Sequence, residues 1–439
     1  MMNKLVSKSG LFLGLISILA QTGWTVGSRG LGNQAIGAYA LGQGNAVTAR
    51  TEDPSANFFN PAALPFLEGT MLGIGLEVIT PFYSHIDSAG TEENAANHIF
   101  LIPNLFLGGP LGQTNWAWGV GITSPYGLAT TWGTTGFSKY MATDSSLAIM
   151  HINPNAAYKI NEGFSIAGGV DYMRSDADLK RQVSVAGVNS QLPPFVFNPT
   201  TPDGTFRQEG DGAGWGWNLA MLLKPREGHR LGLTYRGKIS MTLDGTAQLE
   251  NMSGAMAFVF GGTSYSTGGE SVLRFPDATT LGYAIDLSDK WTVEADLEWT
   301  GWSTFDTQQI RYTQETDPTR LAILNNGNPQ PRNWNDVFSG AIGTQYKLSD
   351  TWKLRGGFMY MDSPIPDETY EPSIPDSDLY GIALGAGYKI RNIGVDVAYL
   401  ANIFPDRTVN NSVGAPLSSA SGTYKSFANS FALNFSCKF

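Results

Sequence analysis

The sequence predicts an all-β membrane protein, a 14-stranded antiparallel transmembrane β-barrel with an N-terminal plug (hatch) in its lumen. Three observations support this fold class. Segments with alternating apolar and polar residues recur along the chain, the links between them are short and long in turn, and the chain ends on Phe439. The sequence accordingly divides into a signal peptide (1–20), the hatch (21–69) and the barrel (70–439).

Composition argues against an ordinary soluble protein. Charged residues make up 15% of the 439 residues, against about 25% in a typical globular chain. The 52 glycines and 12% aromatic residues suit turn-rich strands with aromatic anchors. After residue 20 no apolar run reaches the roughly 18 residues of a helical membrane span. The net charge of −10 argues against nucleic acid as a partner.

The first twenty residues have the pattern of a secretory signal peptide. Lys4 and Lys8 precede an apolar stretch, 11–20, that is too short to cross a bilayer, and cleavage is expected after Ala20. Export leads to an oxidising compartment. One cysteine, Cys437, cannot form an internal disulfide, so no disulfide framework is expected.

The segment 291–299 illustrates the alternation. One face carries Trp291, Val293, Ala295, Leu297 and Trp299. The other face carries Thr292, Glu294, Asp296 and Glu298. The terminal tryptophans lie about 20 Å apart along the membrane normal, which suits the apolar band and aromatic girdles of an outer-membrane barrel.

The segment 231–243 is expected to be one strand with the same alternation. Its apolar face consists of Leu231, Leu233, Tyr235, Ile239, Met241 and Leu243. Its polar face consists of Arg230, Arg236, Lys238 and Ser240. At the C-terminus a similar strand ends on Phe439, which is the assembly signal of exported barrels and indicates the barrel assembly machinery as a partner.

Fourteen segments satisfy the strand pattern. They are 70–82, 98–109, 114–124, 146–159, 163–180, 212–224, 229–245, 271–286, 290–304, 337–348, 351–361, 378–391, 392–404 and 423–439. Exported barrels have short periplasmic turns and long outer loops. The alternation of short and long links therefore predicts a bacterial outer-membrane protein with both termini in the periplasm.

Residues 21–69 show no strand pattern and are rich in Gly and Ala. They could extend into the periplasm or fold inside the barrel. An eight-stranded barrel is just narrow enough for side chains to fill, so a fourteen-stranded one is too wide to be filled by side chains alone. The second reading is preferred, with Asn60, Pro61 and Ala62 against the inner wall.

Several motifs together resemble a known family. They are Gly30-Leu31-Gly32, Asn60-Pro61-Ala62, Gly121 to Thr130, Trp215-Gly216-Trp217-Asn218, Leu233 to Arg236, Thr300 to Ser303, Asp362 to Pro366 and Ser373 to Asp376. In this order and spacing the chain resembles, over essentially its whole length, the FadL-type long-chain fatty acid transporters and their toluene- and xylene-uptake relatives.

The resemblance implies passive uptake of hydrophobic molecules such as fatty acids, alkanes or aromatics, without a cofactor and without enzymatic activity. Ligand would enter an apolar groove between outer loops, reach an inner pocket and leave sideways through a kinked wall. Outer-membrane lipid and lipopolysaccharide are the expected surroundings. Such transfer needs no energy source, because apolar burial contributes about 25 cal/mol per Å².

Large apolar side chains in the outer loops are ligand-binding candidates, since exposed loops rarely carry so many. They are Trp132, Phe137, Tyr140 and Met141 in one loop, and Phe195 and Phe197 in the next. The alternative is that they pack on one another and close the barrel mouth. Trp24 resembles the aromatic residue that plugs the inner pocket in the family; the alternative is a flexible terminus.

Five charged residues are expected to face the lumen. Arg236 and Lys238 lie on the seventh strand, and Glu294, Asp296 and Glu298 lie on the ninth. Small residues on the intervening strand leave a span of about 10 Å, which long side chains can bridge. Because buried charges need partners, at least one cross-strand salt bridge is expected in this set.

Other activities find less support. His85, His98, His151 and His229 lie on different segments without metal-ligand spacing, so no metal site is expected. A general diffusion porin, an outer-membrane hydrolase and an adhesin remain as alternatives. A hydrolase would need a serine and a histidine together on one wall, and the sequence pattern shows no such pair.

The substrate prediction rests on two positions. Asp176 and Asn335 match, by the resemblance, the basic residues that meet a fatty-acid carboxylate. Neither can pair with an anion, although Arg174, Lys180 and Arg181 lie nearby in sequence. Uncharged alkanes or simple aromatics are therefore preferred, with long-chain fatty acids second, because an unpaired carboxylate in an apolar pocket costs several kcal/mol.

Overall fold

The computed structural model describes residues 29–34, 36–192, 198 and 200–439. Within them the chain forms a closed 14-stranded antiparallel β-barrel, which confirms the predicted fold class. The signal peptide and Trp24 lie outside the described residues. No helix of the described part is long and apolar enough to cross a membrane.

The barrel wall follows the predicted order, with three of its strands interrupted. Its strands are β1 (Met71–Ile86), β3 (Phe100–Pro110), β4 (Trp116–Thr123) continued by β5 (Gly127–Thr131), β6 (Asp144–Asn161), β7 (Phe164–Val183), β8 (Gly204–Arg226), β9 (His229–Arg236) continued by β10 (Ile239–Glu250), β11 (Tyr265–Phe275) continued by β12 (Ala278–Ser288), β13 (Trp291–Thr300), β17 (Val337–Lys347), β18 (Trp352–Met361), β19 (Leu379–Ile390), β20 (Ile393–Val409) and β21 (Gly422–Lys438).

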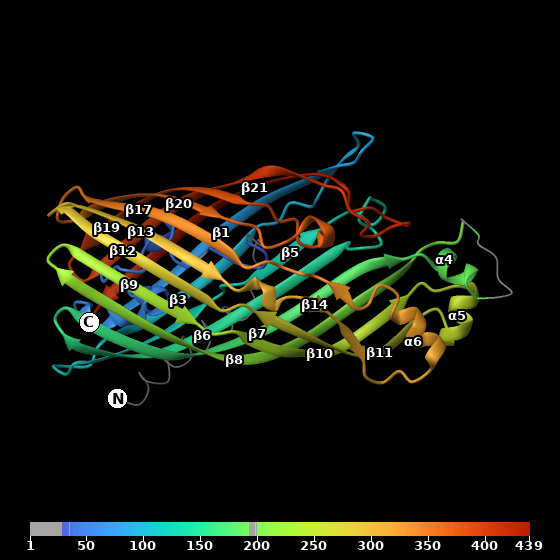
Figure 1. Cartoon of the computed structure of the whole chain (residues 1–439), viewed down its shortest axis with the longest axis horizontal. Coiled ribbons are helices and arrows are strands. Elements are labelled where there is room, and N and C mark those ends of the chain that lie inside the picture. Colours follow the sequence, from blue (N-terminus) through green and yellow to red (C-terminus); the bar gives the residue numbers. More distant parts are fainter. Residues whose placement is uncertain (1–28, 35, 193–197, 199) are drawn as a thin grey trace, which may run out of the picture.

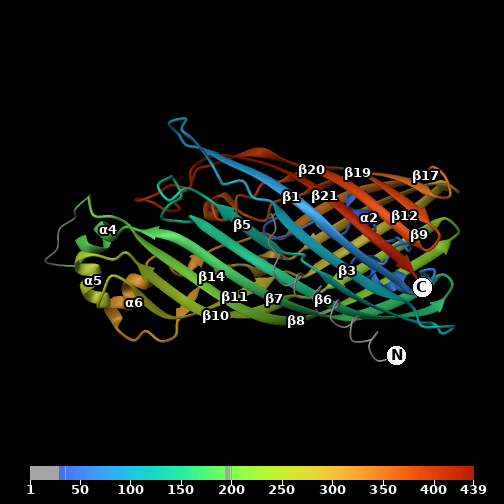
Figure 2. The same cartoon turned by 180° about the vertical axis from the view of Figure 1, so that it is seen from behind.

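The first and last strands close the barrel. β1 pairs with β21 without interruption from Met71–Lys438 to Ile86–Thr423, and the two lie side by side in Figure 2. Closure joins the two ends of the sheet, so that within the described residues each wall strand pairs with a neighbour on both sides over at least part of its length.

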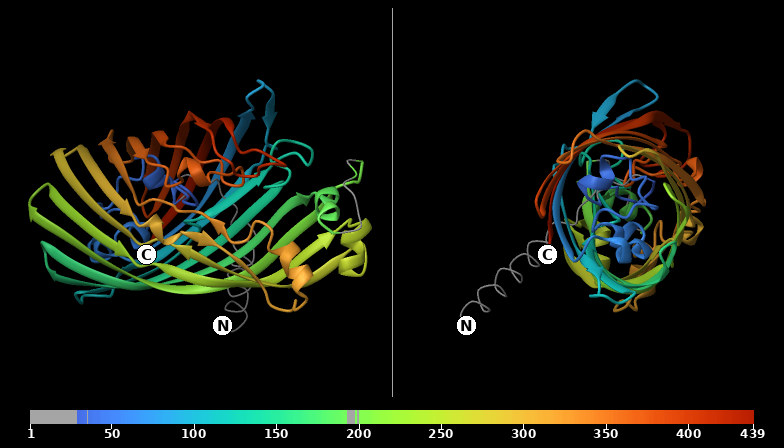
Figure 3. Two further views of the ribbon diagram at one scale, coloured as in Figure 1. Left: turned by 45° about the vertical axis from the view of Figure 1, so that its right-hand side comes forward. Right: turned by 90° about the vertical axis from the view of Figure 1, so that its left-hand side faces the viewer.

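The outer loops contain more structure than the sequence predicted. The additional elements are β2 (Glu92–Asn94), α4 (Val185–Ser190), α5 (Gly254–Phe260), β14 (Thr307–Gln308), β15 (Ile310–Tyr312), α6 (Pro318–Leu324), β16 (Gln330–Pro331) and the short 3₁₀ turns η2 (Trp302–Thr304) and η3 (Asp367–Thr369). Helices α4, α5 and α6 gather at the tip of the long strands β7, β8, β10 and β11, which rise far beyond the rest of the barrel (Figures 1 and 3). They enclose a small apolar core that includes Val185, Met256 and Leu324.

The alternation on β13 is as predicted. Trp291 and Leu297 are 46% and 53% exposed and face outward, whereas Glu294 is fully buried. Outward apolar residues on the other strands, such as Leu384 and Phe431, continue this exterior band. The outside of the barrel therefore suits lipid, and the polar faces point inward.

The prediction of one uninterrupted strand over 231–243 was wrong. β9 ends at Arg236, and Ile239 on β10 is buried inside the barrel, whereas Leu233 on β9 is exposed. Between the pairs Asn218–Arg236 and Asp211–Asp244, seven residue steps on β8 face eight on β9 and β10. One extra residue exchanges the two faces of a strand. Apolar side chains of β10 consequently enter the lumen.

Residues 36–67 lie within the barrel, where Figure 3 (right) shows the blue segment surrounded by the wall. They form α2 (Ala38–Leu41), α3 (Ala56–Phe59) and the 3₁₀ helix η1 (Pro61–Phe66). The Asn60 side chain accepts from the Ala62 amide at 3.0 Å and donates to the carbonyl of Met221 in the wall at 3.1 Å. Asn60 thereby begins η1 and fixes it to β8.

Candidate functional site

A largely apolar cavity of about 130 Å³ lies in the outer half of the lumen. Its lining includes Leu31, Leu128, Met141, Leu147, Leu179, Arg181, Phe206, Leu243, Leu273, Phe305, Tyr312, Arg332, Glu371 and Ile374. These residues come from the hatch, from the wall strands and from three outer loops. A cavity with mostly apolar walls and a few polar groups is the usual form of a small-molecule site.

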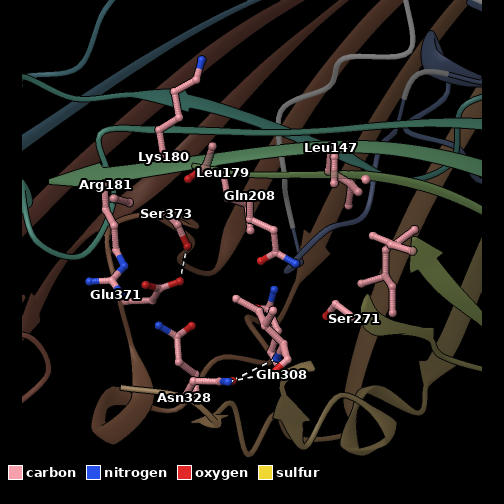
Figure 4. Close-up of a pocket in the computed structure, with 18 of the residues that line it drawn as sticks. Leu147, Leu179, Lys180, Arg181, Gln208, Ser271, Gln308, Asn328, Glu371 and Ser373 are labelled. Atoms are coloured by element: carbon pink, nitrogen blue, oxygen red, sulfur yellow. Dashed lines mark hydrogen bonds between the residues drawn. The ribbon is translucent and has the colours of Figure 1, made fainter. Parts of the chain in front are cut away.

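Arg181 supplies a basic group to this cavity (Figure 4). It lies near the outer end of β7, and its guanidinium carbon is 5.0 Å from the ring centre of Phe206, its partner on β8. Within the described residues the guanidinium has no hydrogen bond or ion pair. Lys180, the neighbouring residue, is directed away from Arg181 and Glu371.

The nearest carboxylate is engaged elsewhere. Glu371 accepts from the Arg332 guanidinium at 2.5 Å and also from the Ser373 hydroxyl. Arg332 also donates to the Gln308 side chain at 2.6 Å. Arg332 therefore neutralises Glu371, and Arg181 keeps its positive charge toward the cavity.

The second feature is a gap in the hydrogen-bond ladder between β3 and β4, which we call the ladder gap. The ladder runs from Pro110–Ala117 and stops at Leu105–Ile122. In the same register, the second further step would place Pro103 opposite Ser124, and the third would place Pro125 opposite Ile102; neither proline has an amide hydrogen to donate. The upper half of β3 is thus left without its neighbour on this side.

The hatch lies against the rim of the ladder gap. The amide of Gly127 donates to the carbonyl of Leu31 at 2.9 Å, and the amide of Asn33 donates to the carbonyl of Pro125 at 2.9 Å. The Asn33 side chain donates to the carbonyl of Ser124 at 2.6 Å. A segment of the hatch therefore satisfies backbone groups at the strand interruption.

The three acidic residues of β13 face inward and bind the hatch. Asp296 accepts from the amides of Val47 and Thr48, each at 3.1 Å. Glu294 accepts from the Ala49 amide at 2.6 Å and pairs with Arg50 at 2.9 Å. Glu298 pairs with Arg29 of the hatch.

The two basic residues have other partners. Arg236 pairs with Asp171 of β7 at 3.0 Å. Lys238 lies in the break between β9 and β10, is half-exposed, and is 3.7 Å from Asp277. The expected salt bridge between these residues and β13 is not formed, because the hatch occupies the lumen in front of β13 and takes up its carboxylates.

The large apolar loop residues were expected either to contact ligand or to pack on one another, and the structure places them differently. Met141 lines the cavity. Trp132 packs edge-on against Phe137 with ring centres 5.1 Å apart, and Phe137 stacks on His85; both therefore pack on other aromatic side chains. The Tyr140 hydroxyl donates to Asp203 at 2.9 Å. Phe195 and Phe197 lie outside the described residues.

The two positions behind the preference for uncharged substrates were wrongly matched. Asp176 lies on the outer face of β7, where its side chain is 62% exposed near Arg174. Asn335 is exposed, and its amide donates to Pro364. Neither lines the cavity, so they say nothing about the ligand. The sequence pattern also missed Arg332, because it belongs to a long loop without periodicity.

An outer loop also meets the hatch. Asp376 accepts from the Gly30 amide and from the Ser363 hydroxyl, each at 2.8 Å. Burial raises the pKa of the Asp376 carboxyl to about 6. No group of three or more His, Cys, Asp or Glu side chains that could hold a metal ion occurs in the described part of the chain.

Comparison with known proteins places this geometry in a family. The family model "Outer membrane protein transport protein (OMPP1/FadL/TodX)" matches residues 25–439. A long-chain fatty acid transport protein of Escherichia coli O6:H1 is 26% identical over 90% of this chain and 91% of its own length.

Solved structures show the same fold. A FadL homologue from Pseudomonas aeruginosa aligns over 93% of this chain and 100% of its own, with a TM-score of 0.80 and 20% identity. The Pseudomonas putida toluene transporter TodX aligns over 93% and 99%, with a TM-score of 0.70 and 20% identity. The chain therefore belongs to the OMPP1/FadL/TodX family of bacterial outer-membrane transport proteins, which are channels and not enzymes.

Proposed function

We propose that this protein takes up long-chain hydrophobic molecules that carry one carboxylate, such as fatty acids, passively across the outer membrane. The observation that carries the proposal is Arg181, whose guanidinium lines an apolar cavity without a partner among the described residues. A partly buried charge of this kind is costly unless it is paired. A ligand carboxylate would supply the pair, and the apolar chain would contact Leu147, Leu243 and Leu273.

Relatives support both ligand classes. Their names include long-chain fatty acid transport proteins as well as a monoaromatic hydrocarbon channel and toluene transporters. Arg181 favours the first class for this chain, in contrast to the preference that the sequence suggested.

The route that we propose leaves the lumen sideways through the ladder gap into the outer leaflet. The gap lies between β3 and the interruption that follows β4, and Leu101 on the outer face of β3 is 44% exposed beside it. An apolar ligand gains free energy on entering lipid, at about 25 cal/mol per Å² of apolar surface removed from water. The hatch, anchored to β13, would block a straight aqueous path.

We propose three further partners from the position of the barrel in the outer membrane: lipid, lipopolysaccharide and the barrel assembly machinery. Outer-membrane lipid would contact the exterior apolar band, and lipopolysaccharide would surround the charged exterior of the long strands. Phe439 is 72% exposed at the C-terminus, as recognition by the barrel assembly machinery requires. Short turns at the end of the barrel that carries this terminus support a periplasmic location for it.

The test is equilibrium binding of oleate and of a neutral alkane of similar length to the purified barrel. Arg181→Met should weaken oleate binding about 10- to 100-fold, since a hydrogen bond to a charged group contributes about 1.5–3 kcal/mol. Alkane binding should be unchanged. Arg174→Met, on the outer face of the same strand, is the matched control and should change neither.

A second variant tests the same assignment by adding a carboxylate to the cavity instead of removing the arginine. Gln208 pairs with Leu179 on β7 and lines the same cavity, so Gln208→Glu should give Arg181 an internal partner and weaken oleate binding about tenfold, whereas Gln208→Leu should not. Equal losses for oleate and alkane in Arg181→Met would overturn the carboxylate assignment. If the unchanged protein binds the alkane but not oleate, its substrates are neutral hydrocarbons. If it gives a steady single-channel current, it is a general diffusion porin.

A further inference from the structure

Four polar side chains form a continuous chain across the lumen face of the wall. Thr123 comes from β4, His151 from β6, Asp171 from β7 and Arg236 from β9. Thr123, His151 and Asp171 are at most 2% exposed. The arrangement crosses five adjacent strands at the level of the ladder gap. Arg236 lines a cavity beside the hatch, whereas Thr123, His151 and Asp171 line neither that cavity nor the one at Arg181.

The hydrogen bonds define a direction through the chain. Asp171 Oδ1 accepts from His151 Nε2 at 2.7 Å and from the Arg236 guanidinium at 3.0 Å. Since Asp171 can only accept when it is ionised, the proton of the neutral imidazole is assigned to Nε2. Nδ1 is then an acceptor, and the Thr123 hydroxyl donates to it at 3.2 Å. Asn218 donates to the second oxygen of Asp171 at 3.2 Å.

A glycine lies on the strand between Asp171 and Arg236. The two residues lie on β9 and β7, and β8 runs between them with Gly216 opposite Asp171. A Cβ on Gly216 would lie 2.6 Å from Ile239 and 3.6 Å from the Cβ of Asp171. A larger residue at this position would therefore collide with Ile239. The salt bridge therefore spans two strand spacings, about 10 Å.

The two ends of the chain touch different parts of the molecule. Thr123 is the last residue of β4 and lies at the rim of the ladder gap. At the other end the Arg236 guanidinium donates to the carbonyl of Phe58 in hatch helix α3 at 3.1 Å and lies 4.4 Å from the centre of the Phe58 ring. One connected network thus joins the rim to the hatch.

We infer that Asp171 is a positioning residue, which holds the rim of the ladder gap and hatch helix α3 in one fixed arrangement through His151 and Arg236. The functional meaning of the rim rests on the proposed sideways exit. Asp171 is the shared acceptor of both arms, so its loss leaves a buried arginine without its charge partner and an imidazole without its orienting bond. Both ends of the network then become free to move.

The order hydroxyl, imidazole, carboxylate is also that of acyl-transfer enzymes, and the sequence pattern did not reveal that a hydroxyl and a histidine meet on one wall. Here Arg236 neutralises the carboxylate, and the hydroxyl is buried at the rim. The family consists of transport proteins. The same bonds therefore serve to position the wall.

Hydrogen exchange of the ligand-free full barrel in detergent or lipid tests the inference. Asp171→Asn should raise exchange at least tenfold both at the rim (residues 121–131) and in the hatch (56–67). The matched control Asp211→Asn, on the outer face of β8 beside Arg174, should leave both unchanged. Thr123→Val removes the hydroxyl donor and should loosen the rim alone, whereas Thr123→Ser keeps the donor and should behave as the unchanged protein.

Faster exchange confined to β7, or spread evenly over the barrel, would overturn the inference, as would equal behaviour of Thr123→Val and Thr123→Ser. If Asp171→Asn does not fold, the two threonine variants still decide. Since exchange is measured without ligand, its result stands apart from transport: loosening as expected in a protein that binds no oleate would refute the proposed function and leave the positioning network intact.

Discussion

The inner and outer halves of the lumen differ in how two arginines, Arg50 and Arg181, are paired. In the inner half, Glu294, Asp296 and Glu298 are all taken up by the hatch, and Arg50 is paired at 2.9 Å in full burial. In the outer half, Arg181 faces an apolar cavity with no partner among the described residues. Paired charges fix the hatch in place, and an unpaired one is available to a ligand.

This difference indicates which charged residues control ligand choice and which control the stability of the fold. Removing one partner of a buried pair leaves an uncompensated charge and destabilises the fold. Removing a charge that has no partner should leave the fold intact and alter binding alone. The inner half is therefore expected to control stability, and the outer half to control ligand choice.

The largest expected effect comes from breaking the inner half. Glu294→Gln removes the buried carboxylate that pairs with Arg50 at 2.9 Å and leaves only the longer contact to Glu52 at 3.8 Å, so it should lower the free energy of unfolding by about 3–5 kcal/mol. Denaturant titration of the folded barrel in lipid vesicles measures the change. The hatch should also loosen, because the Ala49 amide loses its charged acceptor, and planar-bilayer recordings should then show current that the unchanged protein lacks.

Two further variants serve as controls. The double variant Arg50→Met, Glu294→Met should recover most of the lost stability, because neither charge remains. Lys347→Gln breaks a pair with Asp350 in an exposed short turn and should have no measurable effect. A Glu294→Gln variant as stable as the unchanged protein would contradict the assignment of the hatch anchor.

The second prediction concerns Asp376, where the outer loop meets the hatch. Because burial raises its pKa from 3.8 to about 6, the folded state holds the proton more tightly than the unfolded state. The stabilisation is complete below about pH 4 and is lost as the pH rises through 6, a change of roughly 3 kcal/mol. Asp376→Asn should remove this component.

Unfolding free energies at pH 4, 5, 6 and 7 for both proteins test this prediction through their difference. Asp53 of the hatch, whose pKa is also raised to about 6 by burial, contributes equally to both and cancels. Parallel pH profiles for the two proteins would show that Asp376 does not titrate in this range.

The smallest effect is expected outside the lumen. Arg311 of β15 pairs with Glu270 of β11, and its side chain is 74% exposed. Such surface pairs contribute little because water screens them. Arg311→Gln should change the unfolding free energy by less than about 0.5 kcal/mol, and a loss comparable to that of Glu294→Gln would remove the contrast between interior and exterior charges.

Two strands show how much of the fold could be predicted from the sequence. β13 was predicted with its faces correct, because its alternation is unbroken from Trp291 to Trp299. The strand over 231–243 was assigned correctly as far as Arg236 and then on the wrong face. The apolar residues continue at the same spacing after Arg236, so the alternation gives no sign of the extra residue. The extra residue is visible only in the pairing with β8.

The site shows the same limit. Met141 was named from its loop, and Arg181 was noted as a neighbour of Asp176, but the outward direction of Asp176 was not foreseen. Arg332 and Glu371 lie 39 positions apart in irregular loops, where no periodicity predicts a contact.

By itself the sequence determined the barrel, its strand number and the exterior apolar band, because these follow from local alternation and from the lengths of the links. Tertiary structure alone decided the partners of the buried charges and the place of the ladder gap. The physical reason is that an ion pair such as Arg50–Glu294 depends on which segment fills the lumen, and the ladder ends where Pro103 and Pro125 face neighbouring positions across two strands. Neither relation exists until the wall has closed around the hatch.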